Sequence, residues 1–324
     1  MTDKTKKANS KRGGLTRRQS HKAGAVGVFG NPLLIWGTLV ALVLAAFAVV
    51  VYLSASSGSG SASGGGAYVG GDLHALAVDP TDAGTVMVGG HAGAAVSENG
   101  GESWEQIEDL GGADPMGWVV NPEDPQKMYA GGHPGFFRSE DGGESWSMDN
   151  SGLPGTDVHG LGMDAQNPDT LYASIVGEGL YRSPDAGESW QPVNEEISVM
   201  GQIPVDPRDP DTLYLAGPEG EFLKSENGGE DWEQIGQIPG GMAMSISQDR
   251  ENPDTFYAAT GEGVYKSTDG GESWQPSGEG LPGGVSVVSA TADEPGVVYA
   301  GALDGEEARV FRSDDGGESW SARN

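Results

Sequence analysis

The octet SEDGGESW (139–146) decides how this sequence folds, because six versions of it occur along the chain. The other five read SENGGESW (97–104), SPDAGESW (183–190), SENGGEDW (225–232), STDGGESW (267–274) and SDDGGESW (313–320). Their first serines lie 42, 44, 42, 42 and 46 residues apart. A repeat of about 40–45 residues is the length of one β-propeller blade. We therefore expect six blades between residues 72 and 324.

Strand signals recur in a fixed order within each repeat. In the second repeat they read PMGWVV (115–120), KMYAGG (127–132), GFFRS (135–139) and, from the octet onward, SWSMD (145–149). Turn residues separate these short apolar runs, and helical periodicity is absent after residue 54. The pattern predicts an all-β fold, a six-bladed β-propeller of four-stranded antiparallel blades.

The octet falls between the third and fourth strands of each repeat. Asp or Asn at its third position can bond its own turn, Gly at its fifth position can adopt a positive φ, and its Trp is a large apolar wedge. A ligand site is rarely copied six times around a ring. We therefore expect a structural role for Ser97, Trp104, Ser139, Asp141, Trp146, Ser183, Asp185, Trp190, Ser225, Trp232, Ser267, Asp269, Trp274, Ser313, Asp315 and Trp320.

The pattern Ser-x-Asp-x-Gly-x-x-Trp resembles the Asp box, or BNR repeat, of the sialidase superfamily. All six copies keep the Ser, the second Gly and the Trp, while the third position is Asn at 99 and 227. The turns GGHAG (89–93) and GGHPG (131–135) are similar to those of exported bacterial propellers loosely labelled glycosyl hydrolases. The resemblance implies a propeller over 72–324. It implies no activity, because Asp boxes also occur in sortilin-like receptors and photosystem assembly factors.

Sialidases of this superfamily use an arginine triad and a tyrosine nucleophile. Three arginines here precede octet serines and two lie in turns of the opposite face, which leaves only Arg309 and Arg323. The tyrosines share repeat positions and are expected in the core: Tyr129, Tyr172, Tyr181, Tyr214, Tyr257, Tyr265 and Tyr299. A sialidase is therefore not expected, whereas another glycoside hydrolase stays open as an alternative.

Four histidines break the repeat, and all of them fall in the first three blades. His74 and His159 share a position at the start of the first strand, and His91 and His133 share one in the turn between the second and third strands. In a propeller these two places open onto one face around the central channel. Met116 and Met244 take the position of His74 in two other blades.

Imidazoles and thioethers together are the ligands that copper prefers, and imidazoles alone suit zinc. The sequence thus predicts a metal site of His74, His91, His133 and His159, with Met116 and Met244 as secondary ligands and copper or zinc as the ion. The alternative is that the histidines are surface residues with hydrogen bonds and that the methionines pack along the channel without binding a metal.

The N-terminal part differs in composition from the repeats. Residues 1–31 form a basic tail, and residues 32–53 include LLIWGTLVALVLAAFAVVVYL (33–53), long enough for a helix of about 30 Å that spans a membrane. Residues 54–71 have the composition of a Gly/Ser linker. The positive-inside rule places the tail in the cytoplasm and the propeller outside. A cleaved signal peptide is the alternative, although its apolar region is usually about 7–15 residues.

The charge balance narrows the class of partner. Eight of the 18 Lys and Arg but only one of the 48 Asp and Glu precede residue 23, which leaves ten against 47 in the rest, a net charge of −37. Such an acidic domain repels nucleic acid and anionic lipid. The chain has no cysteine, so disulfides and thiolate metal sites are excluded.

These observations predict a single-pass cell-membrane protein whose extracytoplasmic propeller is a binding module. Its ligand is a metal ion or a small molecule on the channel-mouth face, or a glycan or envelope protein. The alternative is a glycoside hydrolase of sialidase-like fold acting on extracellular glycans.

Overall fold

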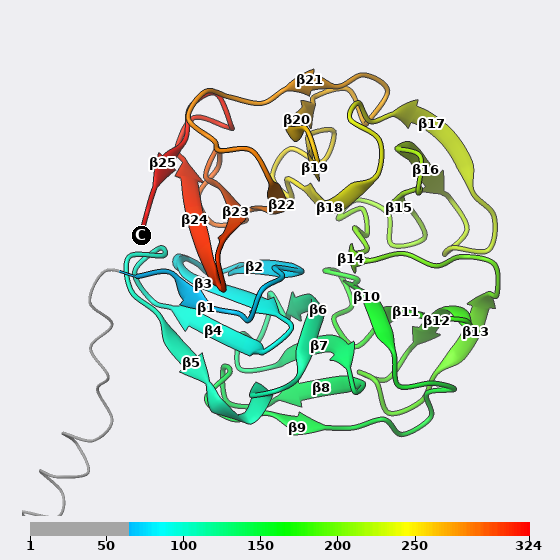
Figure 1. The fold of residues 1–324 in the computed structure, drawn as a ribbon. Coiled ribbons are helices and arrows are strands. Elements are labelled where there is room, and N and C mark those ends of the chain that lie inside the picture. Colours follow the sequence, from blue (N-terminus) through cyan, green and yellow to red (C-terminus); the bar gives the residue numbers. More distant parts are fainter. Residues whose placement is uncertain (1–64) are drawn as a thin grey trace, which may run out of the picture. The chain divides into compact units, whose positions relative to one another are not determined.

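Six β-sheets surround a common axis and follow one another in sequence order around the ring (Figure 1). The computed structural model describes residues 65–324. The predicted basic tail, membrane helix and most of the predicted linker lie outside these residues. Within 65–324, no helix has the length and apolarity to cross a membrane. The prediction of a six-bladed propeller is confirmed.

Four blades have the predicted four strands in antiparallel order from the channel outward. Blade one contains β2 (Ala75–Asp79), β3 (Asp82–Gly90), β4 (Gly93–Ser97) and β5 (Glu105–Ile107), followed by the short 3-10 helix η1 (Glu108–Leu110). Blade two contains β6 (Asp114–Val120), β7 (Met128–His133), β8 (Phe136–Ser139) and β9 (Ser147–Met148). Blade three contains β10 (Val158–Met163), β11 (Leu171–Ile175), β12 (Gly179–Ser183) and β13 (Gln191–Asn194). Blade five contains β18 (Ala243–Gln248), β19 (Phe256–Thr260), β20 (Gly263–Ser267) and β21 (Gln275–Pro276).

Blade four departs from this plan at its innermost strand. Its regular sheet has three strands, β15 (Leu213–Ala216), β16 (Glu221–Ser225) and β17 (Glu233–Gln237). The segment before them begins as β14 (Gly201–Gln202), which pairs in parallel with β10 of blade three, and meets β15 only through a bridge from Val205 to Leu213. Pro204 lies between these two contacts. Because proline donates no hydrogen bond, it interrupts the ladder there.

Blade six closes the ring with both ends of the described chain. Its strands are β22 (Val285–Ala290), β23 (Val298–Asp304), β24 (Glu307–Ser313) and β25 (Ser321–Ala322). The first strand, β1 (Ala67–Tyr68), pairs with the start of β24 at Glu307 and Ala308, whereas β25 pairs with its end at Phe311 and Arg312. The four strands β22–β25 come from one segment of the chain, and β1 adds a fifth strand to this sheet from the other end of the described residues. The end of the stretch 54–71, expected as linker, belongs to the propeller.

The apolar cores lie between neighbouring sheets. Five of the six octet tryptophans are 6–8% exposed, and Trp232 is half-buried. Trp118 of β6 meets Trp146 edge to face, with the ring centroids 5.2 Å apart. The second-strand tyrosines are buried as predicted, and two of them bond the next blade: Tyr257 to Gly316 O and Tyr299 to Ala83 O. Tyr181 and Tyr265 are only half-buried.

Each octet bonds to itself. Its serine Oγ accepts a hydrogen bond of 2.8–2.9 Å from the N–H of the fifth-position glycine, as Ser139 does from Gly143. These six glycines have φ between 87° and 96°, a region that favours glycine. The same serine hydroxyl donates to the Asp or Asn two residues later. All of these bonds therefore serve the turn itself.

Candidate metal centre

The four histidines of residues 65–324 lie on one face of the ring, which we call the histidine rim. His74 immediately precedes β2, and its N–H donates to Gly89 O at 3.0 Å. His91 lies in the β3–β4 turn, His133 ends β7, and His159 is the second residue of β10. The rim is thus formed by blades one, two and three, as the repeat positions predict.

Two glycines bring these turns close to acidic residues. A Cβ on Gly90 would collide with the carbonyl oxygen of Asp72, and a Cβ on Gly132 would collide with that of Asp114. Only glycine permits this close approach. The GGH sequences at 89–91 and 131–133 therefore place each histidine beside an aspartate from the start of the blade.

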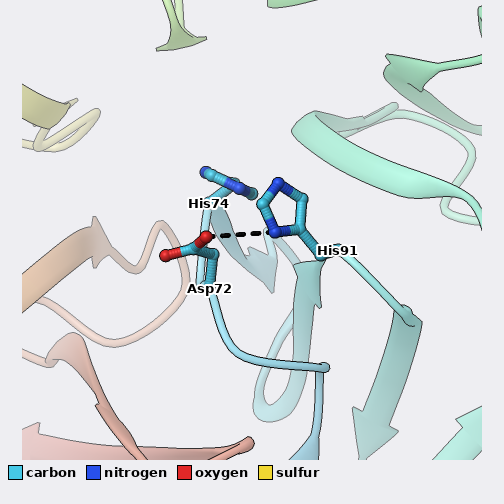
Figure 2. Close-up of side chains that lie close together, drawn as sticks. All are labelled: Asp72, His74 and His91. Carbon is cyan, nitrogen blue, oxygen red and sulfur yellow. Dashed lines mark ion pairs between the residues drawn. The ribbon is translucent and has the colours of Figure 1, made fainter.

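The first group of ligand atoms contains Asp72, His74 and His91 (Figure 2). One ligand atom from each lies within 4.8 Å of the others. His91 Nδ1 is 3.0 Å from Asp72 Oδ2, and the rings of His74 and His91 are 4.8 Å apart at an angle of 66°. Zinc ligands lie about 2 Å from the ion. The group therefore fits one ion after small side-chain movements.

The second group contains His133, Asp157 and His159. Asp157 Oδ1 lies 2.6 Å from His133 Nε2 and 2.8 Å from His159 Nε2. The two rings are 5.4 Å apart at an angle of 82°. These three ligand atoms also lie within 4.8 Å of one another. The composition, two imidazoles and one carboxylate, is the same as in the first group.

Asp114 lies between the two groups. Its Oδ1 is 3.7 Å from His74 Nε2, and its Oδ2 is 3.3 Å from His91 Nε2 and 3.4 Å from His133 Nδ1. The residue is 6% exposed, so water does not solvate it well. A buried carboxylate needs hydrogen bonds or a cation to offset the loss of its hydration.

Several buried polar atoms of this site have no hydrogen-bond partner. They are His74 Nε2, Asp114 Oδ1, Asp157 Oδ1 and His159 Nε2. The last two are only 2.8 Å apart, yet their geometry does not make a hydrogen bond. A cation shared by these two atoms would satisfy both of them.

The electrostatics of His74 agree with a ligand role. Burial lowers the pKa of its imidazole below the usual value, Asp114 acts in the opposite direction, and His91 adds to the lowering. A lowered pKa keeps the imidazole neutral at neutral pH. A neutral imidazole has the lone pair that a metal requires.

The aspartates were missed by the sequence prediction, although a signal exists. Asp72 and Asp157 each stand two residues before a predicted histidine, and Asp114 stands two residues before Met116. This aspartate occurs only in the three blades that form the rim. Alignment of the six repeats therefore distinguishes these three aspartates from the other acidic residues.

The two predicted methionines occupy the expected backbone positions. Met116 in β6 is buried and Met244 in β18 is half-buried. Their sulfur atoms as metal ligands stay a prediction. The groups that do converge contain imidazole and carboxylate, a set that suits zinc and similar divalent ions better than Cu(I).

The two arginines left over for a sialidase triad both form ion pairs with neighbouring carboxylates. Arg323 Nε donates to Gly100 O at 3.0 Å, and its Nη2 lies 2.7 Å from Glu102 Oε1 in blade one. Arg309 Nη1 lies 3.4 Å from Asp304 Oδ2. Arg323 thus joins blade six to blade one, whereas Arg309 is paired within blade six.

Comparison with known families agrees with the octets. The model described as BNR/Asp-box repeat matches residues 265–276 and 311–322. The chain thus contains BNR/Asp-box repeats within a six-bladed β-propeller. No curated protein matches it.

Solved structures similar to this Asp-box propeller include glycoside hydrolases and a lactonase. An ancestral GH74 enzyme has a TM-score of 0.52 at 21% identity over 80% of this chain and 39% of its own. The GH74 xyloglucanase from Xanthomonas campestris has a TM-score of 0.56 at 18% identity, over 80% and 46%. A gluconolactonase from the same organism has a TM-score of 0.57 at 16% identity, over 76% and 88%.

These similarities concern the fold alone. Identities of 16–21% do not carry substrates or catalytic residues from one propeller to another. The chain also spans less than half the length of the two GH74 enzymes.

Proposed function

We propose that this protein is a metal-binding propeller whose histidine rim holds divalent cations, with zinc as the preferred ion. The observation that carries the proposal is the convergence of all four histidines of residues 65–324 with Asp72, Asp114 and Asp157. Histidine nitrogen and carboxylate oxygen together are a common ligand set for zinc.

A cation explains the site better than a network of hydrogen bonds does. Such a network would satisfy the buried polar atoms, but His74 Nε2 and Asp114 Oδ1, which lie 3.7 Å apart, have no hydrogen-bond partner. The acidic domain supports the same choice, because its net charge of −37 raises the local concentration of cations.

The proposed setting is the outer face of a cell membrane. Residues 32–53 would anchor the chain, residues 1–31 would remain in the cytoplasm, and the propeller would bind its ligand outside. The apolar run and the basic excess before it support this orientation.

Calorimetric titration of the detergent-purified full chain with zinc tests the proposal. We expect His91→Ala and His133→Ala each to weaken zinc binding at least about tenfold, since each removes one ligand. Glu188→Gln removes an exposed carboxylate in the octet of blade three and should leave binding unchanged. Equal affinity in all four proteins would reject the rim as the binding site.

A glycoside hydrolase remains the second candidate. Its support is the fold of the GH74 enzymes and the partly exposed carboxylates of Asp72 and Asp157 on the rim. Sugar release from a glycan panel, measured with and without a chelator, separates the two candidates. Release that survives chelation and is lost in Asp157→Asn would favour the hydrolase.

A further inference from the structure

We infer that Asp114 is a positioning residue for the two GGH histidines, His91 and His133, and fixes which ring nitrogen each of them turns toward a cation. This inference rests on the proposed function and adds how two of its ligands are oriented. Asp114 itself is not a ligand in this arrangement. Its Oδ2 atom lies beside the ring nitrogens that the two groups of ligand atoms leave free.

The contact between Asp114 and His133 is set by the sheet of blade two. The β6–β7 ladder places the two residues directly opposite each other, and side chains in such pairs meet. Asp114 Oδ2 and His133 Nδ1 form a hydrogen bond of 3.4 Å. A carboxylate only accepts hydrogen bonds, so the proton belongs to Nδ1. The Nε2 atom of a neutral His133 then has a free lone pair.

This free nitrogen of His133 faces the second group. Nε2 lies 2.6 Å from Asp157 Oδ1, and the same oxygen lies 2.8 Å from His159 Nε2. A metal ion binds a neutral imidazole through such a lone pair and a carboxylate in its ionised form. The hydrogen bond to Asp114 therefore turns His133 into the orientation that a ligand of the second group requires.

His91 has the same relation to Asp114 with its two nitrogens exchanged. Its Nε2 lies 3.3 Å from Asp114 Oδ2, and its Nδ1 lies 3.0 Å from Asp72 Oδ2 in the first group (Figure 2). A carboxylate oxygen has about two lone-pair sites, so Oδ2 can accept from both rings. We therefore expect His91 to bind a cation through Nδ1 and His133 to bind one through Nε2.

The burial of Asp114 suits this role. The residue is 6% exposed, so water competes little for its hydrogen bonds. Metal-ligating histidines commonly donate their other ring N–H to a carboxylate, which fixes the tautomer and the orientation of the ring. Blade two thus serves both groups through Asp114, although Met116 takes the place of the histidine in its own Asp-x-His position.

Nitrogen NMR with magic-angle spinning reads the tautomers directly. The full chain in lipid is labelled with ¹⁵N only in its five histidines, and His91→Ala and His133→Ala assign two of the rings. At about pH 8 free imidazoles are neutral. In the metal-depleted chain we expect the proton on Nδ1 of His133 and on Nε2 of His91. Zinc should then shift the signals of His133 Nε2 and His91 Nδ1.

Asp114→Ala removes the shared acceptor and leaves the four imidazoles and the other two aspartates in place. We expect this variant to show both tautomers of His133 and to bind zinc about 10–100-fold more weakly. Glu188→Gln, the control, should change neither the tautomers nor the affinity. The wild-type spectrum keeps the inference testable should Asp114→Ala not fold.

Two results would overturn the inference without bearing on zinc binding itself. One is a wild-type His133 that is protonated on Nε2 or on both nitrogens, and the other is an unchanged His133 tautomer in Asp114→Ala. The proposed function fails separately: the expected tautomers in a chain that binds no zinc would overturn it, while the hydrogen bonds to Asp114 would stand.

Discussion

The carboxylate of Asp315 shows at the residue scale how an octet holds its turn. Asp315 accepts hydrogen bonds from Ser319 Oγ at 2.6 Å, from Ser319 N–H at 2.8 Å and from Ser313 Oγ at 2.8 Å. Bonds to the charged form favour it, and the bonds from Ser319 are the main cause that lowers the pKa of Asp315 to about 2. Asp141, Asp185 and Asp269 have lowered pKa values for the same reason.

The lowered pKa values of the octet aspartates predict that the protein loses stability in acid. The pKa of Asp315 is lower in the folded chain than the value of about 3.9 in an unfolded one. Its contribution is therefore present above about pH 4 and is lost as the pH falls toward 2. Asp315→Asn should reduce this acid dependence without disrupting the turn, because Asn99 and Asn227 occupy the same position in two other octets.

Denaturant unfolding of the wild type and of Asp315→Asn, measured between about pH 5 and pH 2, checks this prediction. The free energy of unfolding should fall less steeply in the variant. Identical slopes for the two proteins would show that this carboxylate does not contribute to acid sensitivity.

The residues of the rim illustrate what the sequence could and could not predict. The histidines stand out because they interrupt positions that a repeat otherwise defines. The aspartates stand out less, because residues 65–324 contain 47 acidic side chains and only the alignment of the repeats selects these three. The close packing of Gly90 and Gly132 on the main chain of Asp72 and Asp114, which brings two of them to the histidines, is visible only in the fold.

At the scale of elements, the ring depends on a short N-terminal segment. Val69 follows β1 and is fully buried; its N–H donates to Glu306 O of blade six, and its carbonyl accepts from Ala92 of blade one. Ala67 to Val69, together with Gly70, whose N–H also donates to Glu306 O, form this short segment beside Gly-rich sequence. Their small number explains why composition assigned them to a linker, although the six repeated blades themselves were predictable.

Val69→Ala tests the importance of this seam. Removing two buried methyl groups should lower the free energy of unfolding by about 1–3 kcal/mol. Val176→Ala is the matched control, because Val176 is 41% exposed and should change stability by less than about 0.5 kcal/mol. Equal stability of the two variants, measured by chemical denaturation, would contradict the seam's role in closing the ring.

At the scale of the whole molecule, the acidic charge of the propeller should attract cations to the proposed metal site on the histidine rim. Residues 65–324 contain ten basic and 47 acidic side chains, so weak cation binding is expected over much of the surface. Salt screens such exposed charges within about 10 Å at 0.1 M. Binding to the histidine rim should persist at that ionic strength, because it depends on direct coordination rather than on long-range attraction.

Anomalous diffraction from crystals grown with zinc, collected on both sides of the zinc absorption edge, tests this account most directly. We predict that the strongest anomalous peaks lie among His74, His91, His133 and His159, within about 2–2.3 Å of their nitrogens and of the aspartate oxygens. Zinc confined to exposed carboxylates elsewhere, with no peak among the four imidazoles, would contradict it.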